Sequence, residues 1–380
     1  MNQQHSNILL VANWKSDVGY AWWLMESFWA AIAYKYHTHQ KVLLAYPKIN
    51  TLPESIEKAP LNCQEIDFTL TDGKSILKQC QFLLANKIST IYFTDKPSID
   101  LRYALFYLLG VKHIIVHDHT PGNRTKSRGV KKLVKTILHR TPYIRATAMI
   151  ATSPFVSSRH VDVNCFPQAR CFIANNGIPA ATTTDTINVH EKFGIPKQQL
   201  VMVMTGRANR YKGIDFILKS LAELKEQLFD QVNFLFLGDG PDLEHFKSLS
   251  KELKIDELVS FPGRCNNIAA HLKGCDFAIH PSKGEVGYSL SILEYMQNRL
   301  PVIVPDNPSV CGATINGENG LIYKDGNIAE ASAAITALAT NAQMRKSMGA
   351  AAQQHQITQF NLEKTHKELI QAFSNVLSNT

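Results

Sequence analysis

The chain lacks the sequence features of a membrane span, a secretory signal, a disulfide framework or a zinc site. No run of 18 apolar residues occurs in its 380 residues, and residues 2–7 are polar. Its cysteines are odd in number and scattered, without a Cys-x-x-Cys pair: Cys63, Cys80, Cys165, Cys171, Cys265, Cys275 and Cys311. We therefore expect reduced thiols, no metal site and a cytoplasmic protein.

Acidic residues are missing from residues 123–145, which carry eight basic side chains. The rest of the chain carries 32 basic and 32 acidic side chains, so the net charge of +8 belongs to this one segment. The basic residues are Arg124, Lys126, Arg128, Lys131, Lys132, Lys135, Arg140 and Arg145.

The dinucleotide-binding fingerprint Gly-x-Gly-x-x-Gly is also missing where it would be expected. Residues 7–12 have the pattern of a buried strand and residues 20–33 that of a helix, but the loop between them holds a single glycine, Gly19. This argues against NAD binding at the first strand.

What the sequence does contain is a repeated alternation of strand-like and helix-like segments, which predicts parallel sheets covered by helices. In the first half we expect strands at 42–46, 66–70, 90–93, 113–116, 148–151 and 171–174, and helices near 74–87, 99–109 and 128–140. In the second half we expect strands at 199–204, 232–237, 258–261, 276–279 and 301–304, and helices at 213–227, 242–253, 266–273, 289–297, 328–340, 343–355 and 360–378.

The clearest chemical motif lies between His280 and Val304, which read as strand, acidic loop, helix and strand. Glu285 stands in the loop and Glu294 on the helix. In open parallel sheets, a loop at the carboxyl end of a strand is where ligands bind, because helix N-termini offer unpaired N–H groups to phosphate. By themselves, the two glutamates are equally consistent with carboxylates that favour a helix start.

Two further strand-to-helix loops precede this motif. Thr205–Gly213 reads Thr-Gly-Arg-Ala-Asn-Arg-Tyr-Lys-Gly and places the cations Arg207 and Lys212 in one loop. Two cations at such a loop can give a diphosphate charge-assisted hydrogen bonds, although solvated surface cations would look the same. Residues 234–241 form a strand that ends in Gly238-Asp-Gly-Pro, a tight turn.

In this order, the motifs resemble those of the group 1 glycosyltransferases (family 4, retaining, GT-B fold). The loop with Arg207 and Lys212 resembles Gly-Arg-x-x-x-x-Lys-Gly, and residues 285–294 resemble Glu-Gly-Phe-Gly-Leu-x-x-Leu-Glu. Eight residues separate Glu285 from Glu294 where the family has seven, so Val286 reads as an insertion. The resemblance implies two Rossmann-like domains facing each other across a cleft. We expect them at 1–178 and 196–358, with a linker at 179–195 and residues 360–380 packing back on the first.

The resemblance also implies the roles of individual residues. Arg207 and Lys212 would neutralise the diphosphate, Glu294 would hold the ribose, and Glu285 would touch the donor sugar. The remaining residues expected at the donor are Gly206, Gly238, Arg264, Cys265, Gly287, Tyr288, Ser289 and Leu290. No cofactor or metal would be needed beyond the nucleotide sugar donor.

Titratable groups end the strand at 113–116 in the first half, at His117 and His119. An imidazole there can contact the transferring sugar or position an acceptor hydroxyl. His117 matches the family's active-site histidine best, and His119 is the alternative. The His-x-His pair is also compatible with metal binding, but we identify no third ligand. Gly19 corresponds to a loop that the family places at the acceptor and donor phosphates.

The basic segment indicates a further partner. Val130, Leu133, Val134, Ile137 and Leu138 recur at helical spacing, a stripe that is ordinary for a core-facing helix, with Lys131, Lys132 and Lys135 on or near the polar side. Nucleic-acid binding is one interpretation, but stacking aromatics are not interleaved with the cations, and we do not expect it. Another is an anionic membrane surface, with Arg124, Lys126 and Arg128 on the same side as a glycan or lipid-linked acceptor. A merely solvated basic face is the third interpretation.

The sequence therefore predicts a retaining hexosyltransferase acting in bacterial surface polysaccharide, lipopolysaccharide or lipid-linked glycan assembly, cytoplasmic or peripheral on the inner face of the membrane. Three alternatives stay open at this stage. A nucleotide-sugar epimerase or an inverting transferase would share the fold, a nucleic-acid-binding protein would use residues 123–145, and an inactive GT-B scaffold would account for the displaced Glu285.

Overall fold

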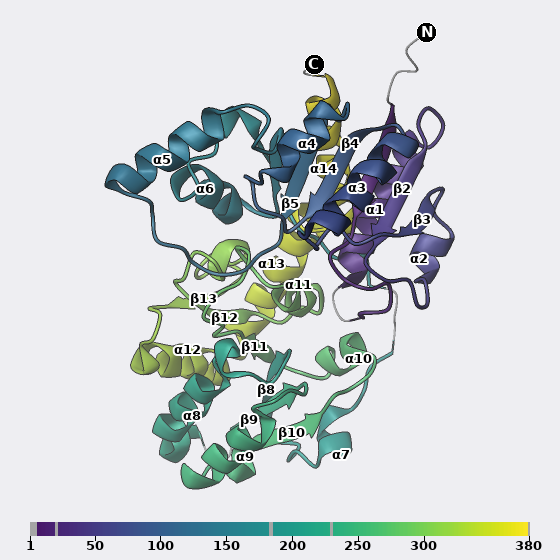
Figure 1. Cartoon of the computed structure of the whole chain (residues 1–380). Helices are drawn as coiled ribbons and strands as arrows, with labels where there is room; N and C mark the ends of the chain where they lie inside the picture. Colours follow the sequence, from purple (N-terminus) through teal and green to yellow (C-terminus); the bar gives the residue numbers. More distant parts are fainter. Residues whose placement is uncertain (1–5, 20–21, 182–184, 229–230, 379–380) are drawn as a thin grey trace. The chain divides into compact units, whose positions relative to one another are not determined.

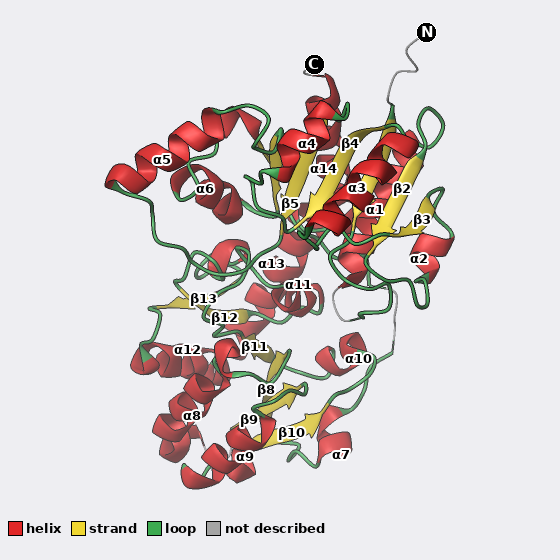
Figure 2. Cartoon of the chain, viewed as in Figure 1, coloured by secondary structure: helices red, strands yellow, loops and turns green. Residues whose placement is uncertain are grey.

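The structure, a computed structural model, describes residues 6–19, 22–181, 185–228 and 231–378 (Figure 1). The chain divides into two compact units, each containing strands and helices (Figure 2). Unit 1 comprises Met1–Thr120, Arg124–Asn175 and Thr365–Thr380, and unit 2 comprises Pro121–Asn123 and Asn176–Lys364. Residues 179–195, which we predicted as a linker, fall in unit 2, with 182–184 outside the described residues.

The strands of unit 1 form one parallel sheet in the order β3-β2-β1-β4-β5-β6-β7. They are β1 (Asn7–Val11), β2 (Val42–Tyr46), β3 (Asn62–Glu65), β4 (Ile88–Thr94), β5 (His113–Asp118), β6 (Ala148–Ala151) and β7 (Cys171–Ile173). The helices are α1 (Trp23–Tyr36), α2 (Glu54–Glu57), α3 (Gly73–Ala85), α4 (Arg102–Leu108), α5 (Gly129–Arg140), α6 (Pro154–Asp162) and most of α14 (Leu362–Ser378). The helix expected from residue 20 begins at Trp23, and residues 20–21 lie outside the described residues.

The two faces of this sheet are covered by different helices, because side chains alternate along each strand. Phe93 of β4 packs in a core with Leu83 of α3 and with Tyr103 and Phe106 of α4. Its neighbour Tyr92 turns the other way and meets Phe373 of α14, 6.1 Å between ring centroids. The C-terminal helix is therefore part of the core of unit 1.

One predicted strand, 66–70, is wrong: β3 ends at Glu65. Ile66 and Phe68 are buried as the alternation indicated. The Ile66 N–H still donates to the Tyr46 carbonyl of β2 at 2.9 Å, but beyond it backbone carbonyls accept from side chains instead of a neighbouring strand. The carbonyl of Leu70 accepts from Gln79 at 3.0 Å and from Arg102 at 3.0 Å, and that of Phe68 accepts from Lys96 at 3.1 Å. The alternating pattern indicates which side chains are buried, but here the buried segment does not form a strand.

The strands of unit 2 form a second parallel sheet in the order β10-β9-β8-β11-β12-β13. They are β8 (Leu200–Thr205), β9 (Val232–Leu237), β10 (Val259–Gly263), β11 (Phe277–Ile279), β12 (Val302–Pro305) and β13 (Gly320–Tyr323). The helices are α7 (Val189–Phe193), α8 (Ile214–Leu228), α9 (Leu243–Glu252), α10 (Ile268–Leu272), α11 (Leu290–Gln297), α12 (Ile328–Thr340) and α13 (Ala342–Gln359). We did not predict β13, a short edge strand with two half-buried residues.

The core of unit 2 fixes the loops that carry its chemistry. Met202 and Met204 of β8 and Phe234 of β9 are fully buried and belong to one cluster with α8, α9 and α12. The carboxyl ends of β8 and β11 lie side by side because these strands are neighbours in the sheet. No helix in the described part of the chain is both long enough and apolar enough to cross a membrane.

Candidate active site

Glu285 of unit 2 lies in a compact ion cluster with Lys212 and His280. Its Oε1 is 2.5 Å from Lys212 Nζ and 3.0 Å from His280 Nε2. Burial alone would raise the pKa of Glu285, but the His280 hydrogen bond and the Lys212 charge outweigh burial and lower it to about 2. Two of the predicted donor residues, Lys212 and Glu285, are thus in direct contact.

His280 is a member of this cluster that we did not single out from the sequence, although it opens the motif. Its side chain is fully buried, and burial lowers its pKa despite the neighbouring carboxylate. Because an ionised carboxylate only accepts, the neutral imidazole must carry its proton on Nε2 and donate it to Glu285. Nδ1 is then an acceptor, buried and without a described partner.

The loop that carries Glu285 is held in place by backbone contacts within unit 2. Gly122 N–H donates to the Glu285 carbonyl at 2.9 Å, and Gly287 N–H donates to the Ser309 carbonyl at 2.8 Å. Gly287 has φ +108°, a conformation that favours glycine. This turn directly follows Val286, the residue that reads as an insertion, and Glu285 on its other side contacts Lys212.

The loop after β8 carries the other predicted donor residues. Arg207 is exposed and has no ion pair among the described residues. Gly206 and Gly238 approach so closely that a Cβ on Gly238 would lie 1.8 Å from the Gly206 carbonyl oxygen. After Lys212, a Cβ on Gly213 would lie 2.4 Å from the Pro281 oxygen, so glycine brings the Lys212 loop against the loop after β11.

Helix α11 begins directly after the acidic loop. Ser289 caps it by accepting from Ser291 N–H at 3.3 Å, and Leu290 is its half-buried first residue. Tyr288 has a structural side chain, buried with its hydroxyl donating to the Asn176 carbonyl at 2.9 Å. Glu294 is half-buried, has no described side-chain partner, and burial raises its pKa to about 7.

Arg264 and Cys265 follow β10, which forms one edge of the sheet of unit 2. Arg264 is exposed, while Cys265 is half-buried with its Sγ 3.9 Å from the Gly263 carbonyl. They occupy a strand-to-helix loop, as the other predicted donor residues do, and they are three strands removed from the loop that carries Glu285.

His117 and His119 of unit 1 lie against each other at the end of β5, with ring centroids 4.2 Å apart and the rings tilted by 51°. His117 is fully buried against Phe28, and its Nδ1 is 2.5 Å from the Tyr92 hydroxyl. Burial lowers the pKa of both imidazoles, that of His119 to about 4. The side chain of His119 keeps 12% of its surface exposed, so His119 is the histidine that a ligand can reach directly.

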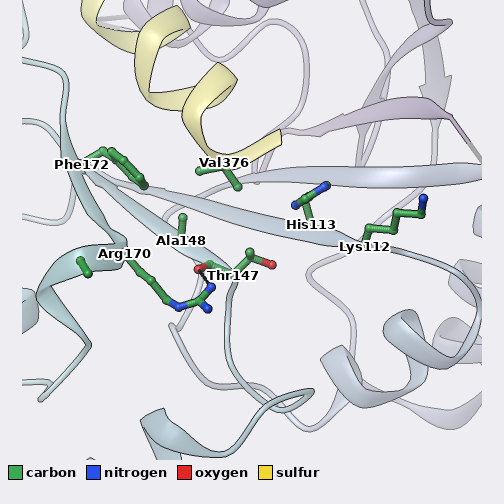
Figure 3. Close-up of a pocket in the computed structure, with 8 residues that line it drawn as sticks. Lys112, His113, Thr147, Ala148, Arg170, Phe172 and Val376 are labelled. Carbon is green, nitrogen blue, oxygen red and sulfur yellow. Dashed lines mark hydrogen bonds between the residues drawn. The ribbon is translucent and has the colours of Figure 1, made fainter. Parts of the chain in front are cut away.

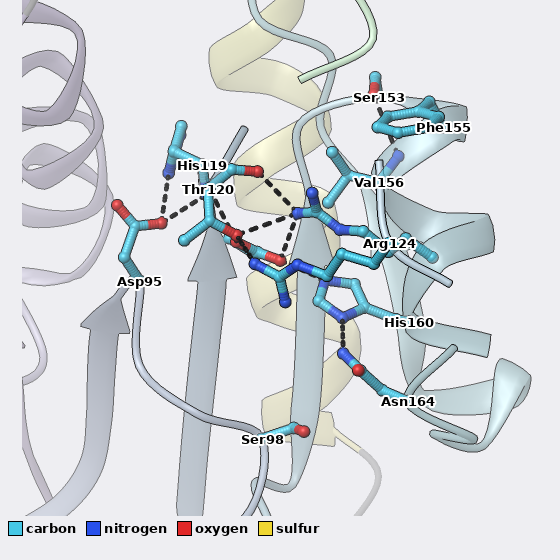
Figure 4. A network of polar contacts seen from close by, with 12 residues as sticks. Asp95, Ser98, His119, Thr120, Arg124, Ser153, Phe155, Val156, His160 and Asn164 are labelled. Atoms are coloured by element: carbon cyan, nitrogen blue, oxygen red, sulfur yellow. Dashed lines mark hydrogen bonds and ion pairs between the residues drawn. The ribbon is translucent and has the colours of Figure 1, made fainter. Parts of the chain in front are cut away.

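A buried polar network surrounds these histidines, and no motif in the sequence indicated it (Figure 4). Arg159 Nη2 is 2.9 Å from Asp118 Oδ2, and Thr120 donates to Asp118 Oδ1 through its N–H at 2.8 Å and its hydroxyl at 2.6 Å. Burial raises the pKa of Asp118, but the charges of His160 and Arg159 and the Thr120 hydrogen bonds lower it overall. The network fixes the backbone that presents His119.

Asp95 contacts the backbone just after the end of β5. It accepts the His119 backbone N–H at 2.5 Å, and burial raises its pKa to about 7. With His119 neutral above about pH 4, the 3.9 Å separation between their side chains does not describe an ion pair near neutral pH. The described residues contain no group of three or more His, Cys, Asp or Glu side chains that could hold a metal ion.

Helix α5 carries the predicted apolar stripe, and that stripe faces solvent. Val130, Leu133 and Ile137 are 76%, 60% and 56% exposed. The helix is attached through its other side, where buried His139 contacts Ser98 at 2.9 Å and Lys135 donates to the Val163 carbonyl at 2.8 Å. Such a stripe ordinarily faces a core, but this one does not.

The cations of this segment divide into paired and unpaired groups. Lys126 pairs with Asp162 at 2.8 Å, and Arg124 donates to the Thr120 hydroxyl at 2.8 Å. Other exposed cations have no side-chain partner in the described part of the chain: Arg128, Lys131, Lys132 and Arg140. Gly19 has φ +73° and open space around its Cβ position, but no contact in the described part of the chain links it to the other predicted residues.

Comparisons with known proteins agree with the motifs. Residues 185–355 match the family described as Glycosyl transferases group 1. An uncharacterized glycosyltransferase of Haemophilus influenzae is 24% identical over 278 residues, 73% of this chain and 72% of that protein. An uncharacterized glycosyltransferase of Methanocaldococcus jannaschii is 27% identical over 192 residues, 50% of this chain, and the chain spans about half of that relative's length, 48%.

Solved structures agree on the fold. A glycosyltransferase from Rickettsia africae superposes with a TM-score of 0.78 at 16% identity, covering 100% of both chains. Anabaena Alr3699/HepE in complex with UDP gives 0.76 at 17% identity, covering 97% of this chain and 100% of that one. WaaG, a glycosyltransferase involved in lipopolysaccharide biosynthesis, gives 0.65 at 14% identity, covering 95% and 98%.

Two parallel Rossmann-like sheets, with these superpositions, define the protein as a member of the GT-B fold class. Residues 185–355 match the group 1 glycosyltransferase family, and the Haemophilus relative is also described as a glycosyltransferase, in agreement with the motifs.

Proposed function

We propose that the protein is a retaining, metal-independent hexosyltransferase that moves a sugar from a nucleoside diphosphate sugar to a hydroxyl acceptor. The observation that supports this proposal most directly is the contact of Lys212 with Glu285 beside the start of α11, in a chain with group 1 motifs. Two cations and the N–H groups of Tyr288, Ser289 and Leu290 are the donors that a diphosphate requires.

In this proposal, each donor residue contacts a different part of the substrate. Arg207 and Lys212 neutralise the leaving diphosphate. Since an ammonium has three donors, Lys212 can bind phosphate and keep Glu285. Glu285 then accepts from the donor sugar, and Glu294 accepts from the ribose hydroxyls, which favours its ionised form. Gly206, Gly238 and Gly287 let the backbone approach the phosphates, and Arg264 and Cys265 meet the nucleobase.

His119 or His117 would contact the transferring sugar or the acceptor. Because their pKa values are lowered, both act as neutral imidazoles near pH 7. In His117 the Tyr92 hydroxyl, whose pKa is raised well above 10, donates to Nδ1, which leaves the Nε2 proton available. By resemblance, a donor phosphate oxygen takes the acceptor proton on the reacting face.

Uracil is the nucleobase to test first, since the Anabaena structure was solved in complex with UDP. We expect calorimetry to detect UDP binding. Glu294→Gln should weaken the binding of both UDP and the UDP-sugar, whereas Glu285→Gln should weaken the binding of the UDP-sugar alone. Reversed effects would mean that the register through Val286 is wrong. The anomer of the product, measured by NMR, separates a retaining transferase from an inverting transferase or an epimerase.

We further propose that α5 docks on an anionic membrane surface on the cytoplasmic side, where the acceptor is a lipid-linked or surface glycan. An exposed apolar stripe beside unpaired cations supports this. At about 100° per residue, Lys131 and Arg140 fall on either side of the stripe. Each cation near an anionic bilayer contributes about 1 kcal/mol, and each large side chain that is buried contributes about 1.5–3 kcal/mol. The similarity to WaaG, which is involved in lipopolysaccharide biosynthesis, is consistent with such an acceptor.

Vesicle sedimentation tests the membrane proposal. We expect binding to anionic but not to neutral vesicles, weakening between 0.05 and 0.5 M salt as the Debye length falls from about 14 to about 4 Å. Leu133→Ser with Ile137→Ser should abolish binding, whereas Leu77→Ser, at another exposed leucine, should not. Equal binding to both vesicle types, or none at low salt, would favour a soluble acceptor.

A further inference from the structure

Unit 1 contains a cavity at the end of its sheet opposite to His117 and His119. It lies at the amino ends of β5, β6 and β7, beneath Val376 of α14 (Figure 3). Two adjoining lobes of about 340 and 270 Å³ share Lys112, Thr147 and Arg170. The length of β5 separates the cavity from the proposed transfer chemistry, roughly 13 Å from His113 to His117 at about 3.3 Å per residue.

The charge around this cavity is positive and uncompensated. Lys112 and Arg170 line both lobes and Arg145 lines the smaller one. Among the described residues no carboxylate lines either lobe, and none of these three cations forms an ion pair. Burial, and then the charge of Arg170, lower the pKa of Arg145, so the two guanidinium groups repel each other. An anion placed between them would relieve that repulsion.

Each lobe has one buried hydrogen-bonding group without a described partner. His113 lines the larger lobe, is 6% exposed, and its buried Nδ1 has no described partner. Arg145 lines the smaller lobe, and its buried Nε has no described partner. Such groups cost free energy when they are left unsatisfied, and an oxyanion bound in either lobe would accept a hydrogen bond from the group that lines it.

Aromatic groups complete the smaller lobe. Tyr107 and Tyr143 meet edge to face with centroids 5.7 Å apart, and the Tyr107 hydroxyl is 2.9 Å from Thr147 Oγ1. Tyr143 follows shortly after α5 and is 64% exposed, which leaves the lobe open on that side. The cavity therefore offers cations at its base and an aromatic rim, a combination suited to a phosphate carried on a larger group.

We propose that this cavity binds the phosphate group of a phosphomonoester, either a free metabolite or a lipid headgroup, through residues distinct from those of the donor site. Lys112 and Arg170, which line both lobes, would hold the phosphate through charge-assisted hydrogen bonds. Arg145 would add to them in the smaller lobe, and neutral His113 would donate through Nδ1 in the larger one. The inference is independent of the proposed transferase activity, because it uses no residue assigned to the donor or to the transfer step.

Calorimetry on the full chain tests this site with two probes, inorganic phosphate and a short-chain phosphatidic acid kept below its micelle concentration. The variant Lys112→Gln with Arg170→Gln changes two exposed side chains, so we expect it to fold, and it should weaken binding at least tenfold. The matched control, Lys74→Gln with Lys78→Gln on α3, removes the same charge from another exposed surface and should bind as the unmodified chain does. Arg145→Gln should weaken binding separately.

The outcomes separate the possible sources of the phosphate and the possible sites. Tighter binding of the lipid than of inorganic phosphate assigns a headgroup, and equal binding assigns a free phosphomonoester. A chain carrying Lys212→Ala should keep this binding, since that change removes a cation of the donor loop and none of the cavity. The proposal is overturned if neither probe binds, or if the Lys112→Gln, Arg170→Gln variant binds as tightly as its control.

Discussion

At the scale of single residues, the contact between Lys212 and Glu285 is the centre of the proposed donor site. Lys212→Ala would remove a cation from the diphosphate and leave the buried Glu285 carboxylate with His280 as its partner. A charge-assisted hydrogen bond contributes about 1.5–3 kcal/mol, so kcat/KM should fall roughly ten- to hundredfold or somewhat more. Steady-state kinetics with the nucleotide sugar that binds in the calorimetric panel measure the effect.

The control for this prediction is Lys219→Ala, which removes an exposed lysine from α8 in the same unit. Its turnover should match that of the unmodified chain. Unchanged turnover in Lys212→Ala as well would remove Lys212 from the diphosphate site.

Glu294 gives a prediction with a defined sign in pH. Its pKa in the folded chain, about 7, lies above the ordinary value of 4.5, so folding favours the protonated carboxyl. The protonated Glu294 carboxyl therefore stabilises the folded chain below about pH 4.5, and this stabilisation is lost as the pH rises through about 7. Glutamine has nearly the shape of a protonated glutamate and is uncharged at every pH. The Glu294→Gln variant should therefore be more stable than the unmodified chain at pH 8, by about 1–3 kcal/mol.

Denaturant unfolding at pH 5 and pH 8, followed by circular dichroism, measures the gap in stability between Glu294→Gln and the unmodified chain. The gap should widen with pH. A gap that is the same at both pH values would mean that the Glu294 carboxylate is solvated in the folded chain.

The sequence could single out several of the candidate site residues because each stands in a short motif. Arg207, Lys212, Glu285 and Glu294 follow from spacing within one loop or one helix. His280, Arg159 and Tyr92 do not: Arg159 reaches Asp118 across 41 positions of sequence, and Tyr92 reaches His117 across 25. Such contacts depend on which strands and helices become neighbours, which local spacing does not specify.

At the scale of elements, α5 shows what hydrophobic periodicity can and cannot establish. The spacing of Val130, Leu133, Val134 and Ile137 predicted the helix, and the helix is present at Gly129–Arg140. The same spacing is compatible with a core-facing stripe, yet these side chains are exposed. Periodicity identifies a face of a helix, but the surroundings of that face come from tertiary packing.

The exposure of α5 leads to a prediction about stability that does not involve a membrane. Leu133→Ser and Ile137→Ser should each change the free energy of unfolding by less than about 0.5 kcal/mol, as surface substitutions do. Leu83→Ser, in buried contact with the core of unit 1, should cost several times more because it leaves a cavity and buries a hydroxyl. Chemical denaturation compares the three variants, and a large loss from Leu133→Ser would place the stripe in a core.

Short elements are where the prediction from sequence was least complete. The expected strand 66–70 and the unexpected β13 are both at the edge of a sheet, where one side of the backbone can be satisfied by side chains or by a single neighbour. Central strands such as β2, β6 and β9 were predicted closely because burial on both faces makes them continuously apolar.

At the scale of the whole molecule, the chain presents three chemically different surfaces: the loops of unit 2 at Lys212 and Glu285, the cationic cavity at Lys112, and the exposed stripe of α5. If they are separate sites, each should respond to its own ligand. Hydrogen exchange followed by mass spectrometry can observe all three in one experiment, because a ligand slows exchange where it orders loops and hydrogen-bonded backbone.

We expect a saturating nucleoside diphosphate to slow exchange in residues 206–213 and 281–290, and not at residues 112 and 145–148. Inorganic phosphate or the short-chain phosphatidic acid should slow exchange at 112 and 145–148. Inorganic phosphate should have a smaller effect on the proposed donor loops, because we expect those loops to bind a single phosphate more weakly than a diphosphate. Anionic vesicles should slow exchange across α5. A nucleotide that protected the Lys112 cavity as strongly as the Lys212 loop would show that the two are not independent, and a phosphate effect confined to 206–213 would leave the donor loops as the anion site of this chain.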